Sequence, residues 1–223
     1  MLFNSSYAEE INLFSTALKD LILEDTTKEN IVFLCIGTDR ATGDTLGPLV
    51  GQKLTSMGIE NVYGTLEKPV HATNLVDTIQ KIKDEVDKPI IIAIDSSNSN
   101  DLSVGTYRLK RGHLKPGEGV GKSLPCVGDI AITGVVMGSS PRFNHLLISS
   151  VRLWEVTKIA DAISEGIIEC IDNLNKIPIE IAKYVEVELH CDTLVKKSYK
   201  SLLQLIKKIL PNKVFIDNTT ISN

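Results

Sequence analysis

The chain has 223 residues, of which 43% are hydrophobic, and a mean hydropathy of +0.07, so it can bury one sizeable core. Its net charge of −4 gives no general affinity for nucleic acid or anionic lipid, and we expect neither as a partner. No apolar stretch reaches membrane-spanning length, no signal peptide precedes the first helix, and the four cysteines lack CxxC spacing, which together predict a cytoplasmic protein with reduced thiols.

The first half of the chain predicts alternating helices and strands. Residues 31–36 are apolar without alternation, as expected of a parallel strand covered on both faces. Residues 89–95 repeat this pattern. The other predicted elements are helices at 6–23, 47–58 and 74–86, and a short strand at 61–66. This order indicates a three-layer α/β/α sandwich with a mainly parallel sheet.

The second half is less regular. Residues 104–110 predict an edge strand, followed by a long glycine-rich loop. Residues 129–137 fit either a strand or a helix, and we favour a short helix. Beyond them we expect a strand at 143–149, a helix at 151–166, a strand at 179–189 and an amphipathic helix at 194–210.

Two aspartates mark the candidate site. Asp44 follows the first buried strand through a glycine-containing loop, and Asp95 ends the second, before Ser96 and Ser97, which we expect to form a turn. Alone, each aspartate is explained by a helix cap or a turn. If the strands are neighbours, however, both carboxylates lie over one crevice, where they can share a proton or activate a water.

The surrounding loops supply candidate substrate contacts. The first loop lacks the GxGxxG and Walker A patterns, so it does not predict a phosphate site. In the later loop, glycines can approach the crevice as a lid or as a cradle for an extended peptide. The four histidines lack zinc-ligand spacing, and we expect no metal or cofactor. The predicted contacts are Gly37, Thr38, Asp39, Gly119, Gly121 and Cys126.

Four segments carry a resemblance to a known family. They read CIGTDRATGDTLGPLVG, IIAIDSSNS, KPGEGVGKSLPCVGDIAITGVV and RLWEVTKIADAISEGI. Together they resemble the YyaC-like sporulation proteins of endospore-forming bacteria, over roughly residues 29–168. More distantly, they resemble the germination protease that degrades small acid-soluble spore proteins, and the hydrogenase maturation endopeptidases.

This resemblance implies roles for single residues. Asp44 and Asp95 match the two carboxylates proposed to be catalytic in the germination protease. In the hydrogenase peptidases the corresponding acids contact nickel in the substrate together with a histidine, whose best match here is Cys126. Because of this difference, we favour chemistry carried by the aspartates alone.

The resemblance also implies an organisation and a function. It predicts a peptidase-like α/β domain at 29–168, while the residue pattern predicts a covering helix at 1–28 and leaves a C-terminal extension at 169–223 outside the resemblance. The implied function is a peptidase of the forespore or spore core, acting on protein substrates such as small acid-soluble spore proteins. The alternatives are a non-catalytic sporulation protein that uses the crevice for peptide binding or assembly, and a small-molecule hydrolase. The sequence leaves a homo-oligomer open.

Overall fold

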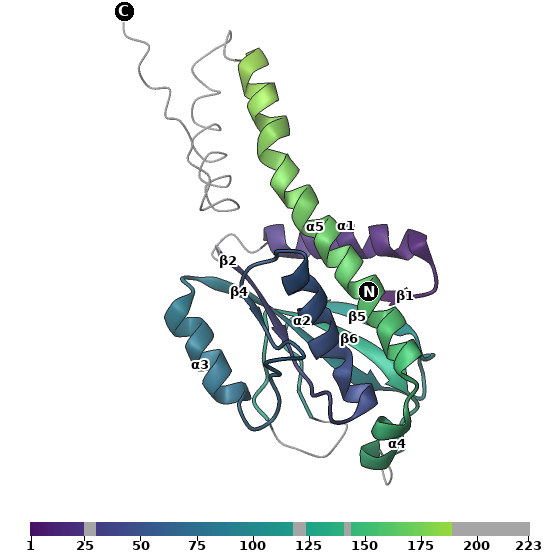
Figure 1. Cartoon of the computed structure of the whole chain (residues 1–223). Helices are drawn as coiled ribbons and strands as arrows, with labels where there is room; N and C mark the ends of the chain where they lie inside the picture. The colour runs from purple at the N-terminus through teal and green to yellow at the C-terminus, as the bar shows by residue number, and fades with distance from the viewer. Residues whose placement is uncertain (25–29, 118–123, 141–143, 189–223) are drawn as a thin grey trace, which may run out of the picture. The chain divides into compact units, whose positions relative to one another are not determined.

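Two apolar strands lie side by side in the sheet (Figure 1). The computed structural model describes residues 1–24, 30–117, 124–140 and 144–188. Strands β2 (Asn30–Cys35) and β4 (Pro89–Asn98) run parallel, paired from Asn30 with Pro89 to Cys35 with Ile94. Their paired residues are apolar on both faces, as predicted, because helices or loops cover both faces there.

The sheet has six strands in the order β1-β5-β6-β4-β2-β3. The pairings among β3, β2, β4 and β6 are parallel, whereas β5 pairs antiparallel with both β6 and β1. The predicted α/β sandwich with a mainly parallel sheet is therefore confirmed. The remaining strands are β1 (Leu2–Asn4), β3 (Val62–Tyr63), β5 (Thr106–Arg111) and β6 (Ile130–Met137).

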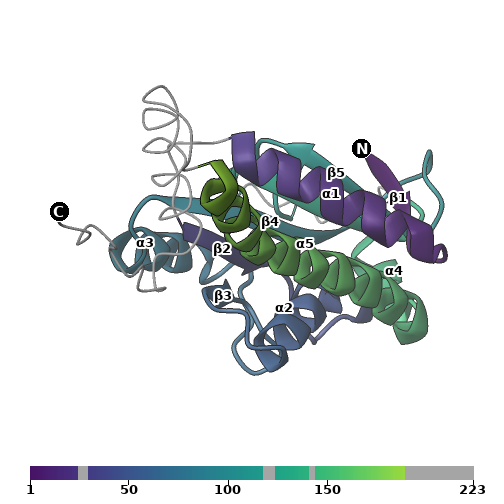
Figure 2. The ribbon, with the colours of Figure 1, turned by 90° about the horizontal axis from the view of Figure 1, so that it is seen from above.

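One face of the sheet is covered by helices α1, α2 and α5 (Figure 2). The Phe14 ring of α1 meets Tyr107 of β5 edge-on, with ring centroids 5.2 Å apart. Gly134 of β6 lies against Leu46 of α2 and Ile159 of α5, so that these helices pack directly on the strand. Their bounds are α1 (Ala8–Glu24), α2 (Leu46–Ser56) and α5 (Leu153–Glu188).

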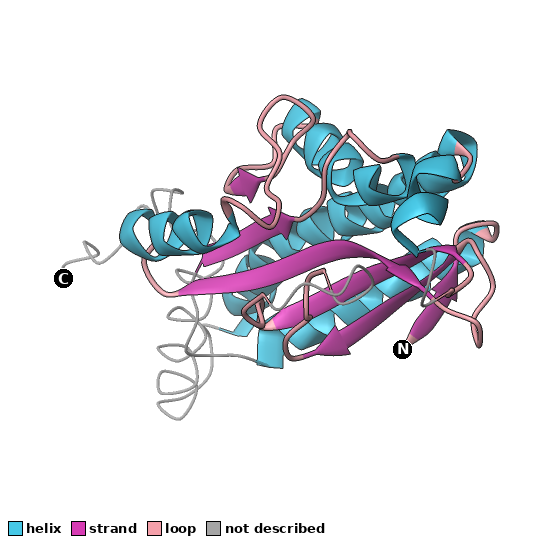
Figure 3. Cartoon of the chain, turned by 90° about the horizontal axis from the view of Figure 1, so that it is seen from below, coloured by secondary structure: helices cyan, strands magenta, loops and turns pink. Residues whose placement is uncertain are grey.

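The opposite face is covered by α3 (Leu75–Glu85) and by residues of the loop that follows β5 (Figure 3). Leu75 and Ile82 of α3 share one apolar cluster with Val32 and Leu34 of β2. Leu114 also belongs to this cluster. Over β5 and β6, by contrast, this face borders a cavity.

Three predicted elements of the second half are wrong. Residues 129–137 contain strand β6 and not a helix, because the segment is held between β4 and β5 and its residues are buried on both faces. Strand β5 is not an edge, since β1 pairs with it. Residues 143–149 were predicted to be a strand, whereas helix α4 (Asn144–Ser150) begins where the Asn144 side chain accepts a hydrogen bond from the Ser140 amide.

Helix α5 is longer than predicted. It continues past Gly166, which packs closely against Phe14, and it runs to Glu188, so the strand predicted at 179–189 is wrong for 179–188. The helix predicted at 194–210 lies outside the described residues. The chain divides into two units, Met1–Asp172 and Asn173–Asn223, and the first contains the whole sheet. Within the described residues, no helix is long and apolar enough to cross a membrane.

Candidate active site

Two close backbone approaches hold Asp44 beside the end of β2. Gly37 has φ +143°, and a side chain there would clash with the carbonyl oxygen of Asp44. The Thr38 amide donates to the same oxygen over 3.0 Å. A side chain at Gly47 would likewise clash with the carbonyl oxygen of Ile36. The glycines therefore let the loop fold back onto the strand.

Asp44 itself lies in a short 3-10 helix, η1 (Thr42–Thr45), which leads directly into α2. The N-cap of η1 is Ala41 and that of α2 is Thr45, so neither helix is capped by Asp44. This removes the helix-cap explanation of the aspartate. The structure instead places Asp44 next to β4, beyond the carboxyl end of β2.

Asp95 lies within β4 and not at its end. The pairing with β2 stops at Ile94, but β4 continues beside β6, where Asp95 is opposite Thr133. The turn predicted at Ser96 and Ser97 is therefore wrong, because β6 supplies a strand partner beyond the point at which β2 ends.

The carboxyl group of Asp95 is buried and interacts with that of Asp44. Asp95 is only 8% exposed. Burial, followed by the negative charge of Asp44, raises the pKa of Asp95 well above its usual range, and a hydrogen bond of 2.8 Å from the Ser96 amide to Oδ1 partly opposes this. Asp95 thus keeps a proton at a pH at which an ordinary aspartate is charged.

Both aspartates line one cavity of about 730 Å³. Polar side chains from the end of β4 and basic side chains from β5 line it together with residues of β6 and α4. The lining also includes Ser96, Ser97, Asn98, Ser99, Arg108, Lys110, Leu114, Lys115, Thr133, Val135, Asn144 and Ile148. The cavity therefore brings together groups from segments that are far apart in the sequence.

The predicted substrate contacts that the structure describes do not line the cavity. Gly37 is buried in the turn that positions Asp44, while Asp39 and Cys126 are exposed. None of these three, nor Thr38, is among the described residues that line the cavity. Gly119 and Gly121 lie outside the described residues. Substrate contact by these six residues stays a prediction.

Most residues of the cavity wall were missed from the sequence, among them Arg108, Lys110 and Thr133. Arg108 and Lys110 alternate with Tyr107 and Leu109 along β5, and Thr133 lies opposite Arg108 on β6. The alternation of basic and apolar residues at 107–110 was the available signal. This alternation could not identify the cavity wall, because it does not show what the basic side chains face in the folded protein.

The chain contains histidine, cysteine and acidic side chains, which are the usual metal ligands in proteins. In the part of the chain that the structure describes, no three histidine, cysteine or acidic side chains gather as metal ligands. His113, in the glycine-rich loop, instead places Nδ1 2.7 Å from the carbonyl oxygen of Gly128. The expectation of a metal-free site stays a prediction.

Comparison with known proteins places the chain in a family. A Bacillus subtilis (strain 168) protein named "Uncharacterized protein YyaC" is 45% identical over 139 residues, which cover 61% of this chain and 67% of that protein. Among solved structures, the [NiFe] hydrogenase maturation protease HycI from Thermococcus kodakarensis KOD1 aligns with a TM-score of 0.41 at 18% identity, over 68% of this chain and 98% of that one.

The resemblance to YyaC-like proteins is thus confirmed. Residues 3–166, which include every strand of the sheet except the first residue of β1, match the family model described as "Protein of unknown function (DUF1256)". The chain therefore belongs to the DUF1256 family.

Proposed function

We propose that this protein is a hydrolase that cleaves peptide bonds with Asp44 and Asp95. The observation that carries the proposal is the burial of Asp95 beside Asp44 in a single cavity. Two neighbouring carboxyl groups, of which one has a raised pKa, provide one acid and one base at the same pH. Asp95, whose pKa is raised, is the acid, and the more exposed Asp44 is the base.

The reaction follows from these two roles. Asp44 accepts a proton from a water whose oxygen attacks the carbonyl carbon of the peptide bond. Asp95 donates its proton to the leaving nitrogen as the carbon–nitrogen bond breaks. The products are a new carboxyl group and a new amine, and transfer of a proton from Asp44 to Asp95 restores the starting state.

An extended peptide suits the shape of the site. The cavity volume of about 730 Å³ lies within the range of ligand sites, which is roughly 300–1,000 Å³. Beyond Ile94, the β2 side of β4 has no strand partner among the described residues. There η1 contacts β4 and the Ser96 amide already donates to Asp95 Oδ1, so we expect the peptide to lie across the face of the sheet that borders the cavity and not as an added strand.

The proposed setting is the cytoplasm of the forespore or spore core, with small acid-soluble spore proteins as substrates. This part of the proposal is supported by the resemblance of the motifs around Asp44 and Asp95 to sporulation proteins and the germination protease. These proteins are the first substrates to test.

The test is hydrolysis by the purified full-length protein in water enriched in ¹⁸O, with and without a chelator. Small acid-soluble spore proteins serve as substrate, and mass spectrometry identifies the new termini. We expect one ¹⁸O atom in each new carboxyl group, no effect of the chelator, and a loss of at least about 100-fold in rate for Asp44→Asn and for Asp95→Asn, as expected when an acid or a base is removed.

The matched control is Asp101→Asn, because Asp101 is exposed and is not among the residues lining the cavity. This variant should retain the wild-type rate. Hydrolysis that survives both Asp44→Asn and Asp95→Asn would refute the assignment. Peptide binding without hydrolysis by the wild-type protein would favour the non-catalytic alternative.

A further inference from the structure

The cavity that holds the two aspartates also has a basic wall. We use this name for Arg108, Lys110 and Lys115, which all line the cavity. Arg108 and Lys110 lie two residues apart on β5, so their side chains project from the same face of the sheet. The pairing of β5 with β6, and of β6 with β4, shows that the Asp95 side chain projects from this same face.

Strand register fixes the distance between the basic wall and the acid pair. Arg108 is opposite Thr133 of β6, and Thr133 is opposite Asp95 of β4. With neighbouring strands about 4.8 Å apart, the Cα atoms of Arg108 and Asp95 are roughly 10 Å apart. An extended peptide rises about 3.3 Å per residue, so this distance spans roughly three residues of substrate.

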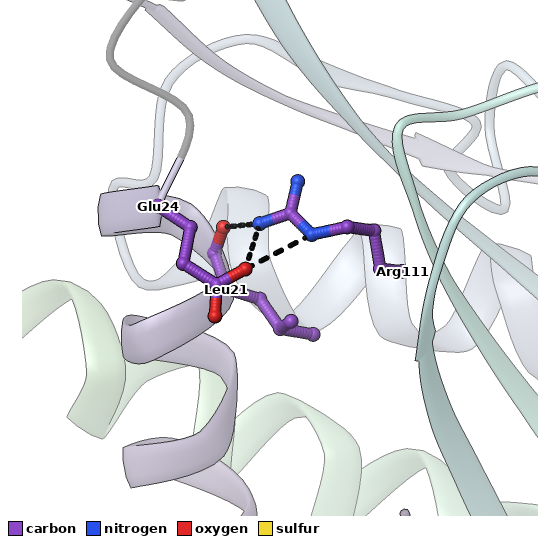
Figure 4. Close-up of polar contacts among 3 residues, drawn as sticks. All are labelled: Leu21, Glu24 and Arg111. Carbon is purple, nitrogen blue, oxygen red and sulfur yellow. Dashed lines mark hydrogen bonds and ion pairs between the residues drawn. The ribbon is translucent and has the colours of Figure 1, made fainter.

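The basic wall has no partner of opposite charge among the described residues. None of its three side chains forms an ion pair or a side-chain hydrogen bond there. Arg111, the next basic residue of β5, provides the contrast: its guanidinium donates to Glu24 Oε2 over 2.7 Å and to the Leu21 carbonyl oxygen over 2.7 Å (Figure 4). One arginine of this strand is engaged by α1, whereas the other faces the cavity.

The charge of the cavity is opposite to that of the protein. Its basic wall contributes three positive charges, against two aspartates, of which Asp95 has a raised pKa. The chain as a whole has a net charge of −4. A cavity of one sign within a protein of the other concentrates ligands of the opposite charge locally.

We propose that the basic wall binds a carboxylate of the substrate, so that the preferred substrate is a carboxylate-bearing peptide. This inference rests on the proposed function, because it names the substrate class of the same site. Arginine and lysine form strong charge-assisted hydrogen bonds with carboxylates. The carboxylate is supplied by an acidic side chain roughly three residues from the cleaved bond, or by the C-terminus of the peptide.

Binding is measured without turnover, in the full-length Asp44→Asn protein, by fluorescence anisotropy. Three labelled decapeptides are compared: alternating Glu and Ala with an amidated C-terminus, its Gln counterpart with the same amide, and the Gln counterpart with a free C-terminus. We expect at least one carboxylate-bearing peptide to bind about tenfold more tightly than the neutral amide, a difference that added salt reduces. The peptide that binds more tightly than the neutral amide identifies the source of the carboxylate.

Two charge-removing variants of the same strand are then compared. Arg108→Gln should reduce the preference to about twofold or less, whereas Arg111→Gln should retain it. Circular dichroism checks the fold, and Lys110→Gln replaces Arg108→Gln if that variant does not fold. Equal binding of all three peptides, no binding of any, or equal losses in the two arginine variants would overturn the proposal.

Different outcomes would refute the peptidase assignment and the role of the basic wall. Carboxylate-dependent binding without hydrolysis by the wild-type protein leaves the basic wall assigned and refutes the peptidase. Hydrolysis that depends on Asp44 and Asp95 but treats carboxylate-bearing peptides and the neutral amide alike supports the peptidase and overturns the role of the basic wall.

Discussion

The two faces of the sheet differ in composition although the same strands form both. On the side of α1, Tyr107 of β5 is fully buried and packs against Phe3 and Phe14, with ring centroids 5.4 and 5.2 Å away. On the other side, Arg108 and Lys110 of the same strand line the cavity. One strand therefore contributes to the core with one set of residues and to the candidate site with the alternate set.

The same division applies to β4 and β6. Ile94 is fully buried on one side of β4, and the adjacent Asp95 faces the cavity on the other. In β6, Gly134 meets the helices while Thr133 lines the cavity. Since adjacent residues of a strand point to opposite faces, substitutions one position apart should separate stability from function.

The largest effect is expected from Tyr107→Ala. Removing this buried ring leaves a cavity between Phe3 and Phe14, which should lower the free energy of unfolding by about 3–5 kcal/mol. The adjacent change Arg108→Ala, at an exposed position, should alter it by about 0.5 kcal/mol or less. Urea denaturation measures both. Similar losses in the two variants would show that the faces are not divided as described.

The second prediction concerns the junction of the covering helices and the site. Gly47→Ala forces a Cβ against the Ile36 backbone, so α2 and η1 must move away from β2. We expect a loss of about 1–3 kcal/mol in unfolding free energy, as for other overpacked sites, together with reduced hydrolysis, because Asp44 moves with η1.

The control is Gly58→Ala, at the C-terminal end of α2. Gly58 has φ +79° and nothing within 4 Å of an added Cβ, so the change costs about 1–2 kcal/mol through backbone conformation alone. It should leave hydrolysis unchanged. Equal losses of activity in the two variants would mean that activity follows stability and not the position of Asp44.

The parts of the fold that could be predicted are those with strong local signals. The apolar runs of β2 and β4 predict buried strands. Gly58 predicts the end of α2, because glycine readily adopts the left-handed backbone that follows a helix. The pairing of Asp44 with Asp95 could be predicted only on the condition that the two apolar runs form neighbouring parallel strands, which the pairing of β2 with β4 fulfils. Order along the chain was sufficient for the strands and the helix end.

The remaining features depend on contacts between distant segments. Strand β6 could not be distinguished from a helix because its residues are apolar on both faces, and only pairing with β4 and β5 decides its conformation. Likewise, β5 looked like an edge because its partner, β1, is three residues at the start of the chain. Arg108 was missed for the same reason, since strand register determines what it faces.

The third prediction is that Asp95→Asn stabilises the protein at neutral pH. Burial and the charge of Asp44 raise the pKa of Asp95 in the folded state above the value of about 3.9 in the unfolded chain. Between these two values the folded protein holds the proton and the unfolded chain does not, so wild-type stability falls as pH rises. Each pKa unit corresponds to about 1.4 kcal/mol.

Asparagine has no ionisable carboxyl group, so the Asp95→Asn variant lacks the pH dependence of stability that Asp95 causes. Urea denaturation between pH 4 and 8 should show the variant exceeding the wild type increasingly as pH rises, with Asp101→Asn following the wild type. A wild-type stability that rises with pH while the Asp95→Asn variant matches it throughout would show that Asp95 carries no raised pKa.

The smallest effect is expected from Lys53→Ala, which removes an ion pair on the outer side of the covering helices. Lys53 of α2 pairs with Asp161 of α5, and the two side chains are 38% and 39% exposed. Such a pair contributes about 0–1 kcal/mol and is screened by salt, so the loss in unfolding free energy should be small and should disappear in about 1 M salt. Peptide binding should not change, in contrast to Arg108→Gln. A loss above about 2 kcal/mol would show that charge, and not apolar packing, holds these helices together.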